Sequence, residues 1–136
     1  MSHAVYLMFN GNAEEAMNFY KESLDGTIEA SQRYGDTQMP SSEAYKDKIM
    51  HATMDFQGFK IMFSDSNEKG NVTFGNNFSI AFDFKSDGDI QRAFDNISAG
   101  GTVTMPLQDT FWGAKFGMCT DKFGVNWMFN YDKPKA

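Results

Sequence analysis

The sequence predicts an α+β protein in which a strand–helix–strand–strand–strand unit occurs twice. The first observation is the order of elements, which begins again after a polar, glycine-rich stretch at residues 66–77. The second is that the two halves can be aligned, with GTIE at residues 26–29 opposite GTVT at residues 101–104. The third is the alternation of apolar and polar side chains in the expected strands, which gives each sheet one apolar face for helices to cover.

The first half supplies four strands and one helix. Asn12 can cap the helix and Gly26 follows its end, so the helix is expected between these two residues. The last two strands are joined by Gln57 and Gly58, which suit a tight hairpin turn. In chain order, the expected strands are residues 4–10, 27–34, 48–56 and 59–65, and the helix is residues 12–26.

The second half repeats this order. Phe84 aligns with Phe9 of the first half, and Asp87 or Asp89 is the candidate cap of the second helix. The expected strands are residues 78–84, 102–107, 114–120 and 125–131, and the helix is residues 87–101.

The length of 136 residues fits one domain that buries a core without disulfides or metal. Within it we place module 1 at about residues 1–66, a linker at about 67–77 and module 2 at about 78–136. The single cysteine, Cys119, has no partner for an internal disulfide, and no signal peptide or membrane span is recognised. We therefore expect a cytoplasmic location.

The charge is moderately acidic and evenly spread. Twelve basic and eighteen acidic side chains give a net charge of −6, without a run of like charge. A nucleic-acid or anionic-membrane partner is therefore not expected.

Strand parity separates core from candidate site. Trp127 and Phe129 are expected in the core, and Phe78 on the apolar face of its strand. Ile49 shares the opposite, mixed face of its strand with the site candidates. The site candidates on the mixed faces are His51, Thr53 and Asp55 in residues 48–56, Ser79 and Asp83 in residues 78–84, and Asn126 and Met128 in residues 125–131.

Several motifs point to one family. They are LMFNGN at residues 7–12, YGD at 34–36, His51-Ala52, GGTVTMPLQDTFWGAKFGM at 100–118 and DKFGVNWM at 121–128. Together they resemble the PhnB-like branch of the vicinal oxygen chelate superfamily, which also contains glyoxalase I, extradiol dioxygenases, and bleomycin and fosfomycin resistance proteins. The resemblance covers nearly the whole chain.

The resemblance implies two tandem βαβββ modules that form a curved mixed sheet around a cup, with the helices on the outer face. It also implies a homodimer whose pockets lie near the subunit interface. A fold does not by itself imply a reaction.

The metal enzymes of the superfamily take histidine and glutamate ligands from the first and last strands of each module. The matching segments here are residues 4–8, 59–63, 78–82 and 125–129, and they contain no His, Asp, Glu or Cys. The register places Val5, Met62, Ser79 and Met128 at the ligand positions. Because these side chains are poor ligands for a hard divalent cation, we expect no metal. No phosphate-cradling loop or glycine-rich dinucleotide fingerprint appears, so we expect no other cofactor.

Three features of the sequence bear on other chemistry. His51 and Asp55 share a strand face and could form a dyad or a relocated metal site, although a histidine bonded to a neighbour is the plainer interpretation. Cys119 is expected to be a buried structural thiol. Because no strand is followed by a glycine-rich turn and an acidic ribose ligand, the methyltransferase function often assigned to this branch is not expected here.

The aromatic-rich second half is expected to divide between core and site. Trp112 precedes a strand in which Phe116 and Met118 share one face, so it can form a pocket wall or anchor a dimer interface.

These observations predict a small-molecule-binding protein that binds or sequesters an unidentified organic compound, with a cationic guest favoured by the two aspartates of the site. One alternative is a lyase or isomerase that uses His51 or Asp55 as general base, or a relocated metal. Another is a structural dimer whose cup is filled by its own side chains. The candidate ligand-binding residues are His51, Thr53, Asp55, Ser79, Asp83, Trp112, Phe116, Met118, Asn126 and Met128.

Overall fold

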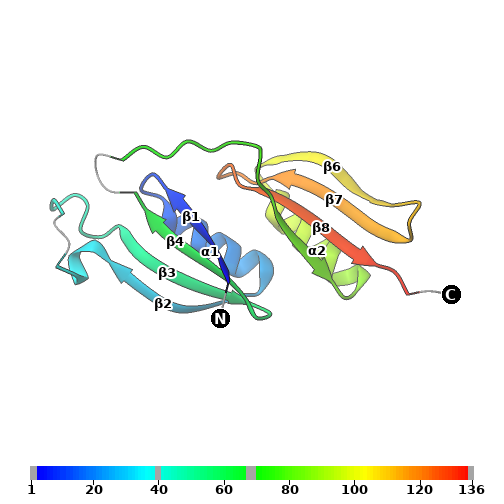
Figure 1. Cartoon of the computed structure of the whole chain (residues 1–136), viewed down its shortest axis with the longest axis horizontal. Helices are drawn as coiled ribbons and strands as arrows, with labels where there is room; N and C mark the ends of the chain where they lie inside the picture. Colours follow the sequence, from blue (N-terminus) through cyan, green and yellow to red (C-terminus); the bar gives the residue numbers. More distant parts are fainter. Residues whose placement is uncertain (1–2, 39–40, 67–69, 135–136) are drawn as a thin grey trace. The chain divides into compact units, whose positions relative to one another are not determined.

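A computed structural model describes residues 3–38, 41–66 and 70–134. The chain divides into two compact units, Met1–Thr73 (unit 1) and Phe74–Ala136 (unit 2), each of which contains one helix and one four-stranded sheet (Figure 1). The boundary between the units falls within the expected linker, whose residues 67–69 lie outside the described residues.

Unit 1 follows the order strand, helix and three strands. Its sheet has the strand order β1-β4-β3-β2, in which β1 is parallel to β4 and the other pairs are antiparallel. A short 3₁₀ turn, Tyr34–Asp36, follows β2. The elements are β1 (Ala4–Phe9), α1 (Ala13–Leu24), β2 (Thr27–Arg33), β3 (Ile49–Phe56) and β4 (Phe59–Asp65).

Unit 2 has the same plan. The order of its sheet is β5-β8-β7-β6, again with the first pair parallel and the others antiparallel. Its elements are β5 (Ile80–Phe84), α2 (Asp87–Ser98), β6 (Thr102–Asp109), β7 (Ala114–Thr120) and β8 (Asn126–Asp132). The expected fold class of two tandem βαβββ modules is confirmed.

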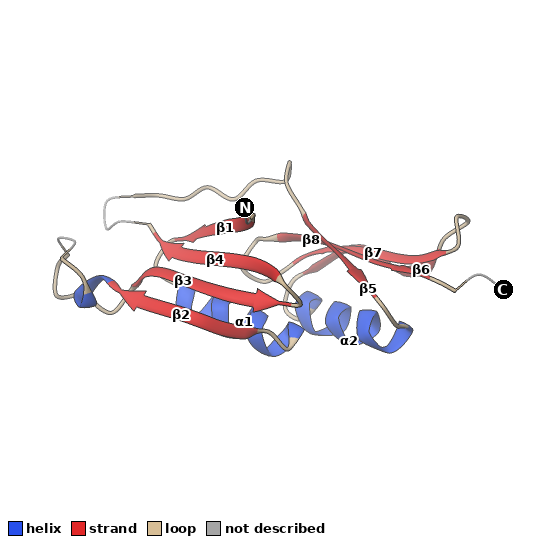
Figure 2. Cartoon of the chain, turned by 60° about the horizontal axis from the view of Figure 1, so that its bottom comes forward, coloured by secondary structure: helices blue, strands red, loops and turns tan. Residues whose placement is uncertain are grey.

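In each unit the helix lies along one face of its sheet (Figure 2). Equivalent aromatic pairs fill the two cores, since the rings of Phe9 and Phe63 are stacked with centroids 6.3 Å apart, and those of Phe84 and Phe129 with centroids 6.0 Å apart. Trp127 is fully buried, as its parity predicts. Burying each large apolar side chain of this kind contributes roughly 1.5–3 kcal/mol.

Neither helix is capped by the predicted side chain. Asn12 is at the N-cap position of α1 but makes no side-chain cap hydrogen bond. The Asp65 carboxylate, from the end of β4, accepts the backbone N–H groups of Gly11 and Ala13 instead, both at 2.9 Å. Helix α2 is capped by Ser86, whose hydroxyl accepts the N–H of Asp89 at 3.1 Å, and not by Asp87 or Asp89.

Two predictions about strand faces are also wrong. Phe78 precedes β5 and is 60% exposed, because the strand begins only at Ile80. Ile49 is fully buried, although its parity placed it on the mixed face with His51. The pairing with β2 shifts between Gln32 and Arg33, and such a bulge re-aims the side chains beyond it.

Candidate functional site

The face of each sheet that its helix leaves uncovered is called here the open face of that unit. In unit 1, His51, Thr53 and Asp55 lie on it, alternating along β3 with the buried Ala52 and Met54. Neighbouring strands add Tyr6 and Met62, which are register partners on β1 and β4. The three predicted residues therefore share one face, as the sequence indicates.

Both ring nitrogens of His51 have hydrogen-bond partners. The Tyr6 hydroxyl lies 3.0 Å from Nδ1, and the Thr53 hydroxyl lies 3.3 Å from Nε2. Tyr6 was not among the sequence candidates. The signal that could have found it is its parity on β1, where Tyr6 and Met8 alternate with the less exposed Val5 and Leu7.

Asp55 is held in an ion pair at the hairpin end of the open face. Lys60 Nζ lies 3.0 Å from its carboxylate and 2.6 Å from that of Glu29. The hydrogen bond from Lys60 is the main cause that lowers the pKa of Asp55 below its ordinary value. His51 and Asp55 therefore have different partners and do not form a dyad. The plainer interpretation, a histidine bonded to its neighbours, is confirmed.

The open face of unit 2 brings together most of the remaining candidates. Asn130 donates its side-chain amide to Asp83 at 2.9 Å. The register across β5, β8 and β7 places Ala81, Met128 and Met118 in one row and Asp83, Asn130 and Phe116 in the next.

A small cavity of about 200 Å³ lies at one end of this sheet. It contains three predicted residues, and sequence reasoning missed the amide and hydroxyl residues contributed by the loop before β5 and by β6 and β7. Its lining is uncharged: Asn76, Ser79, Thr104, Met118, Cys119, Thr120, Asn126 and Trp127.

Asn126 fixes the wall of this cavity. Its Nδ2 donates to the carbonyl groups of Gly75 at 3.0 Å and Phe78 at 3.2 Å, and its Oδ1 accepts the Thr120 hydroxyl at 2.7 Å. These bonds tie the loop before β5 to β8. Asn126 therefore holds the wall of the cavity in place through hydrogen bonds within the protein.

Cys119 is among the residues that line the cavity and is buried, with only 1% of its surface exposed. Burial, with a smaller contribution from Asp121, raises the pKa of its thiol to about 12. A thiol that stays protonated near neutral pH is a poor nucleophile, which agrees with the predicted structural role.

Trp112 lies in the β6–β7 turn and is exposed. Its ring makes an edge contact with Phe111 at 4.9 Å and with Phe116 at 6.4 Å between centroids. Over the described residues, the lining of the 200 Å³ cavity does not include Trp112, Phe116 or Met128. The alternatives of pocket wall and dimer contact stay open for Trp112.

The motif DKFGVNWM has a structural explanation. The buried carboxylate of Asp121 accepts the N–H groups of Phe123 at 2.8 Å and Val125 at 3.1 Å, and the indole N–H of Trp127 at 2.8 Å. Gly124 has φ of +98°, a conformation that favours glycine. The motif therefore encodes the β7–β8 turn and anchors the core tryptophan.

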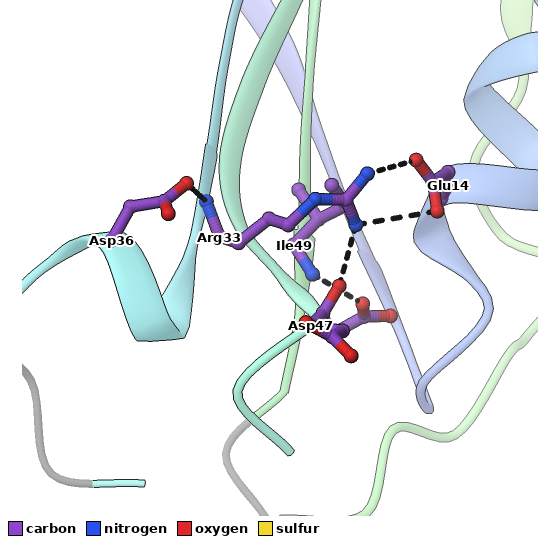
Figure 3. Close-up of polar contacts among 6 residues, drawn as sticks. Glu14, Arg33, Asp36, Asp47 and Ile49 are labelled. Carbon is purple, nitrogen blue, oxygen red and sulfur yellow. Dashed lines mark hydrogen bonds and ion pairs between the residues drawn. The ribbon is translucent and has the colours of Figure 1, made fainter. Parts of the chain in front are cut away.

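A second, strongly polar cavity of about 400 Å³ lies beside the start of α1. Figure 3 shows Arg33 in this region, paired with the Glu14 carboxylate and donating to the Asp47 carbonyl at 2.6 Å. This pairing lowers the pKa of Glu14. Lys48 donates to the Gly11 carbonyl at 2.8 Å, so both cations of the cavity already have partners in the fold.

The residues at the positions of the superfamily's metal ligands do not fit a divalent cation. Val5, predicted at one ligand position, pairs with the buried Ile61 on the helix-covered side, and Tyr6 takes its place beside Met62. In unit 2, Met128 pairs with Ala81, whereas Ser79 precedes the strand. A phenol, a methyl group and two thioethers are a poor donor set for a hard cation.

Within residues 3–38, 41–66 and 70–134, no three His, Cys, Asp or Glu side chains are grouped so that they could hold a metal ion. In the same residues, no helix combines the length and apolar character needed to cross a membrane.

Comparison with known proteins agrees with the architecture. The crystal structure of protein PA1353 from Pseudomonas aeruginosa is 40% identical, with a TM-score of 0.90 over 98% of this chain and 99% of that one. A putative 3-demethylubiquinone-9 3-methyltransferase, PhnB protein, from Bacillus cereus is 32% identical, with a TM-score of 0.81 over 96% and 99%. A glyoxylase/bleomycin resistance protein/dioxygenase domain from Frankia shares the fold at 16% identity, with a TM-score of 0.70 over 98% of each chain.

The family model described as 3-demethylubiquinone-9 3-methyltransferase matches residues 2–129, which is most of the chain. The matched residues span both modules and include the β7–β8 turn motif. The Bacillus cereus PhnB protein is similar over 96% of this chain. The chain belongs to this PhnB-like family, and it shares the fold of the glyoxylase/bleomycin resistance protein/dioxygenase domain.

Proposed function

We propose that this protein binds or sequesters a small organic compound, without the metal of the superfamily's enzymes, as a cytoplasmic homodimer. The observation that carries the proposal is the 200 Å³ cavity of unit 2, with its uncharged hydroxyl, amide, thiol and thioether lining. Soft apolar atoms with a few fixed polar groups are typical of small-molecule sites.

The size and lining of the cavity define the guest. The volume is below the range of about 300–1,000 Å³ that drug-sized ligands occupy, so a compact molecule is expected. The sequence favoured a cationic guest because of Asp55 and Asp83. Among the described residues, neither aspartate lines this cavity and its lining carries no charged side chain, so a neutral guest is expected there.

Two catalytic interpretations receive less support. Asp55 is a weakened base because of Lys60, which leaves His51 as the candidate for lyase or isomerase chemistry. The methyltransferase named in the family description is not part of the proposal. In the described residues, no strand leads into a glycine-rich turn followed by an acidic ribose ligand of the kind adenosylmethionine-type donors use.

The test is a titration of a library of neutral fragments into ¹⁵N-labelled protein, with amide shifts mapped by NMR. Bound fragments should shift the resonances of Met118, Thr120 and Trp127. Ser79→Leu, which extends a side chain into the cavity, should reduce the affinity at least tenfold, whereas the same change at the exposed Ser31 should leave it unchanged. Equal affinity in wild type and Ser79→Leu would remove the cavity as the site.

A further inference from the structure

We infer that Asn10 is a deamidation site that the native fold protects, and that its conversion to aspartate or isoaspartate loosens residues 70–73 from the corner between β1 and α1. The modified group is the Asn10 carboxamide, and the co-reactant is water. Asn10 and Gly11 form the one Asn-Gly dipeptide of the sequence. Because glycine has no Cβ, its backbone nitrogen can approach the preceding side chain more closely than that of another residue.

The reaction starts within the chain. The backbone nitrogen of Gly11 loses its proton and attacks Cγ of Asn10, the bond from Cγ to Nδ2 breaks, and ammonia leaves with that proton. Water then opens the cyclic imide at one of its two carbonyl groups, which gives aspartate or isoaspartate. The sum is the exchange of one water molecule for one ammonia, and no atom is oxidised or reduced.

The attacking nitrogen is held in its protonated form by Asp65. Gly11 N–H donates to Asp65 Oδ1 at 2.9 Å, and Asp65 has only 1% of its surface exposed. A carboxylate that binds the N–H group would repel the deprotonated nitrogen, so this contact opposes loss of the proton. The other end of the same residue is also fixed, because the Gly11 carbonyl accepts Lys48 Nζ at 2.8 Å.

The carboxamide of Asn10 is held by the linker. Its Nδ2 donates to the Val72 carbonyl at 2.9 Å, and its Oδ1 accepts the Val72 N–H at 2.8 Å. Since these two bonds fix the side-chain torsions of Asn10, a rotation of Cγ toward the Gly11 nitrogen has to break them. Asn10 is exposed to water, so its conversion requires a local opening of this corner and not global unfolding.

Conversion changes the contact between Asn10 and Val72. A carboxylate has no N–H group for the Val72 carbonyl and places an oxygen against it. Residues 70–73 therefore lose part of their attachment to the corner between β1 and α1. The hydrogen bonds from Asn126 to Gly75 and Phe78 in unit 2 do not involve Asn10, so the cavity of the proposed function is not needed for this inference.

The test follows the conversion of Asn10 by peptide mapping with mass spectrometry in a mildly alkaline buffer. Conversion should be slower by about tenfold or more in the folded protein than in the same protein unfolded in urea. Val72→Pro removes the N–H donor to Asn10 and should speed conversion in the folded protein by about three- to tenfold, the effect of one hydrogen bond. Thr73→Pro leaves that N–H group in place and should not change the rate.

Asn10→Asp, which makes one of the two products directly, tests the structural consequence. Amide hydrogen exchange at residues 71–73 should be faster than in wild type. Asn12→Asp adds the same charge at the same corner and should leave this exchange unchanged. Equal conversion rates in folded and unfolded wild type would overturn the protection, and unchanged exchange in Asn10→Asp would overturn the loosening of residues 70–73.

Discussion

At the scale of single residues, two buried aspartates stabilise the backbone at the start of α1 and in the β7–β8 turn by accepting N–H groups. Asp65 accepts three backbone N–H groups, those of Gly11, Ala13 and Ile49, each at 2.9 Å. Asp121 accepts two backbone N–H groups and the indole N–H of Trp127. A buried carboxylate is costly unless such donors satisfy it, so each aspartate specifies the backbone conformation around it.

Asp121→Asn tests this role. The amide places an NH₂ group against N–H donors, so we expect the free energy of unfolding to fall by about 2–3 kcal/mol. Urea denaturation followed by tryptophan fluorescence measures the change. The control is Asp95→Asn, an exposed carboxylate on α2, which should change the stability little. A loss for Asp121→Asn no larger than that of the control would contradict the role.

At the scale of elements, turns and bulges decide where side chains point. Gln57 and Gly58 of the β3–β4 hairpin have φ of 52° and 87°, as a two-residue turn with both central residues left-handed requires. The bulge opposite Arg33 turns Ile49 into the core while His51 stays on the open face. The faces that carry the candidate sites therefore depend on these local irregularities.

Gln57→Asn should stabilise the hairpin. Asparagine tolerates the left-handed conformation better than glutamine, so we expect a gain of about 0.5–1 kcal/mol. Thermal unfolding followed by circular dichroism measures it. Gln57→Ala, which lacks this tolerance, should give no gain, and a melting temperature of Gln57→Asn at or below that of Gln57→Ala would show that the backbone here is not strained.

At the scale of the whole molecule, two units repeat one plan but carry different open faces. Unit 1 presents a Tyr–His–Thr chain beside an ion-pair cluster, whereas unit 2 presents an uncharged cavity and an exposed aromatic turn at Phe111 and Trp112. Exposed aromatic side chains of this size are typical of contact surfaces, which is in keeping with the proposed homodimer.

Native mass spectrometry and plasma mass spectrometry of the purified protein test this description together. We expect a dimer. We also expect no stoichiometric metal, because the donor set at the superfamily's ligand positions is a phenol, a methyl group and two thioethers. One equivalent of Zn, Ni, Fe or Mn per chain would contradict the metal-free proposal. A monomer at all concentrations would contradict the homodimer.

The sequence by itself determined the repeated units, the strand faces other than those of Ile49 and Phe78, and the core positions of Trp127 and Phe129, because these follow from side-chain periodicity along the chain. Only the tertiary structure decided which distant groups meet. Asp65 caps a helix 52 residues earlier, and Tyr6 meets His51 across 45 residues of sequence. Periodicity carries no information on such contacts, since they depend on strand register, bulges and the packing of whole elements.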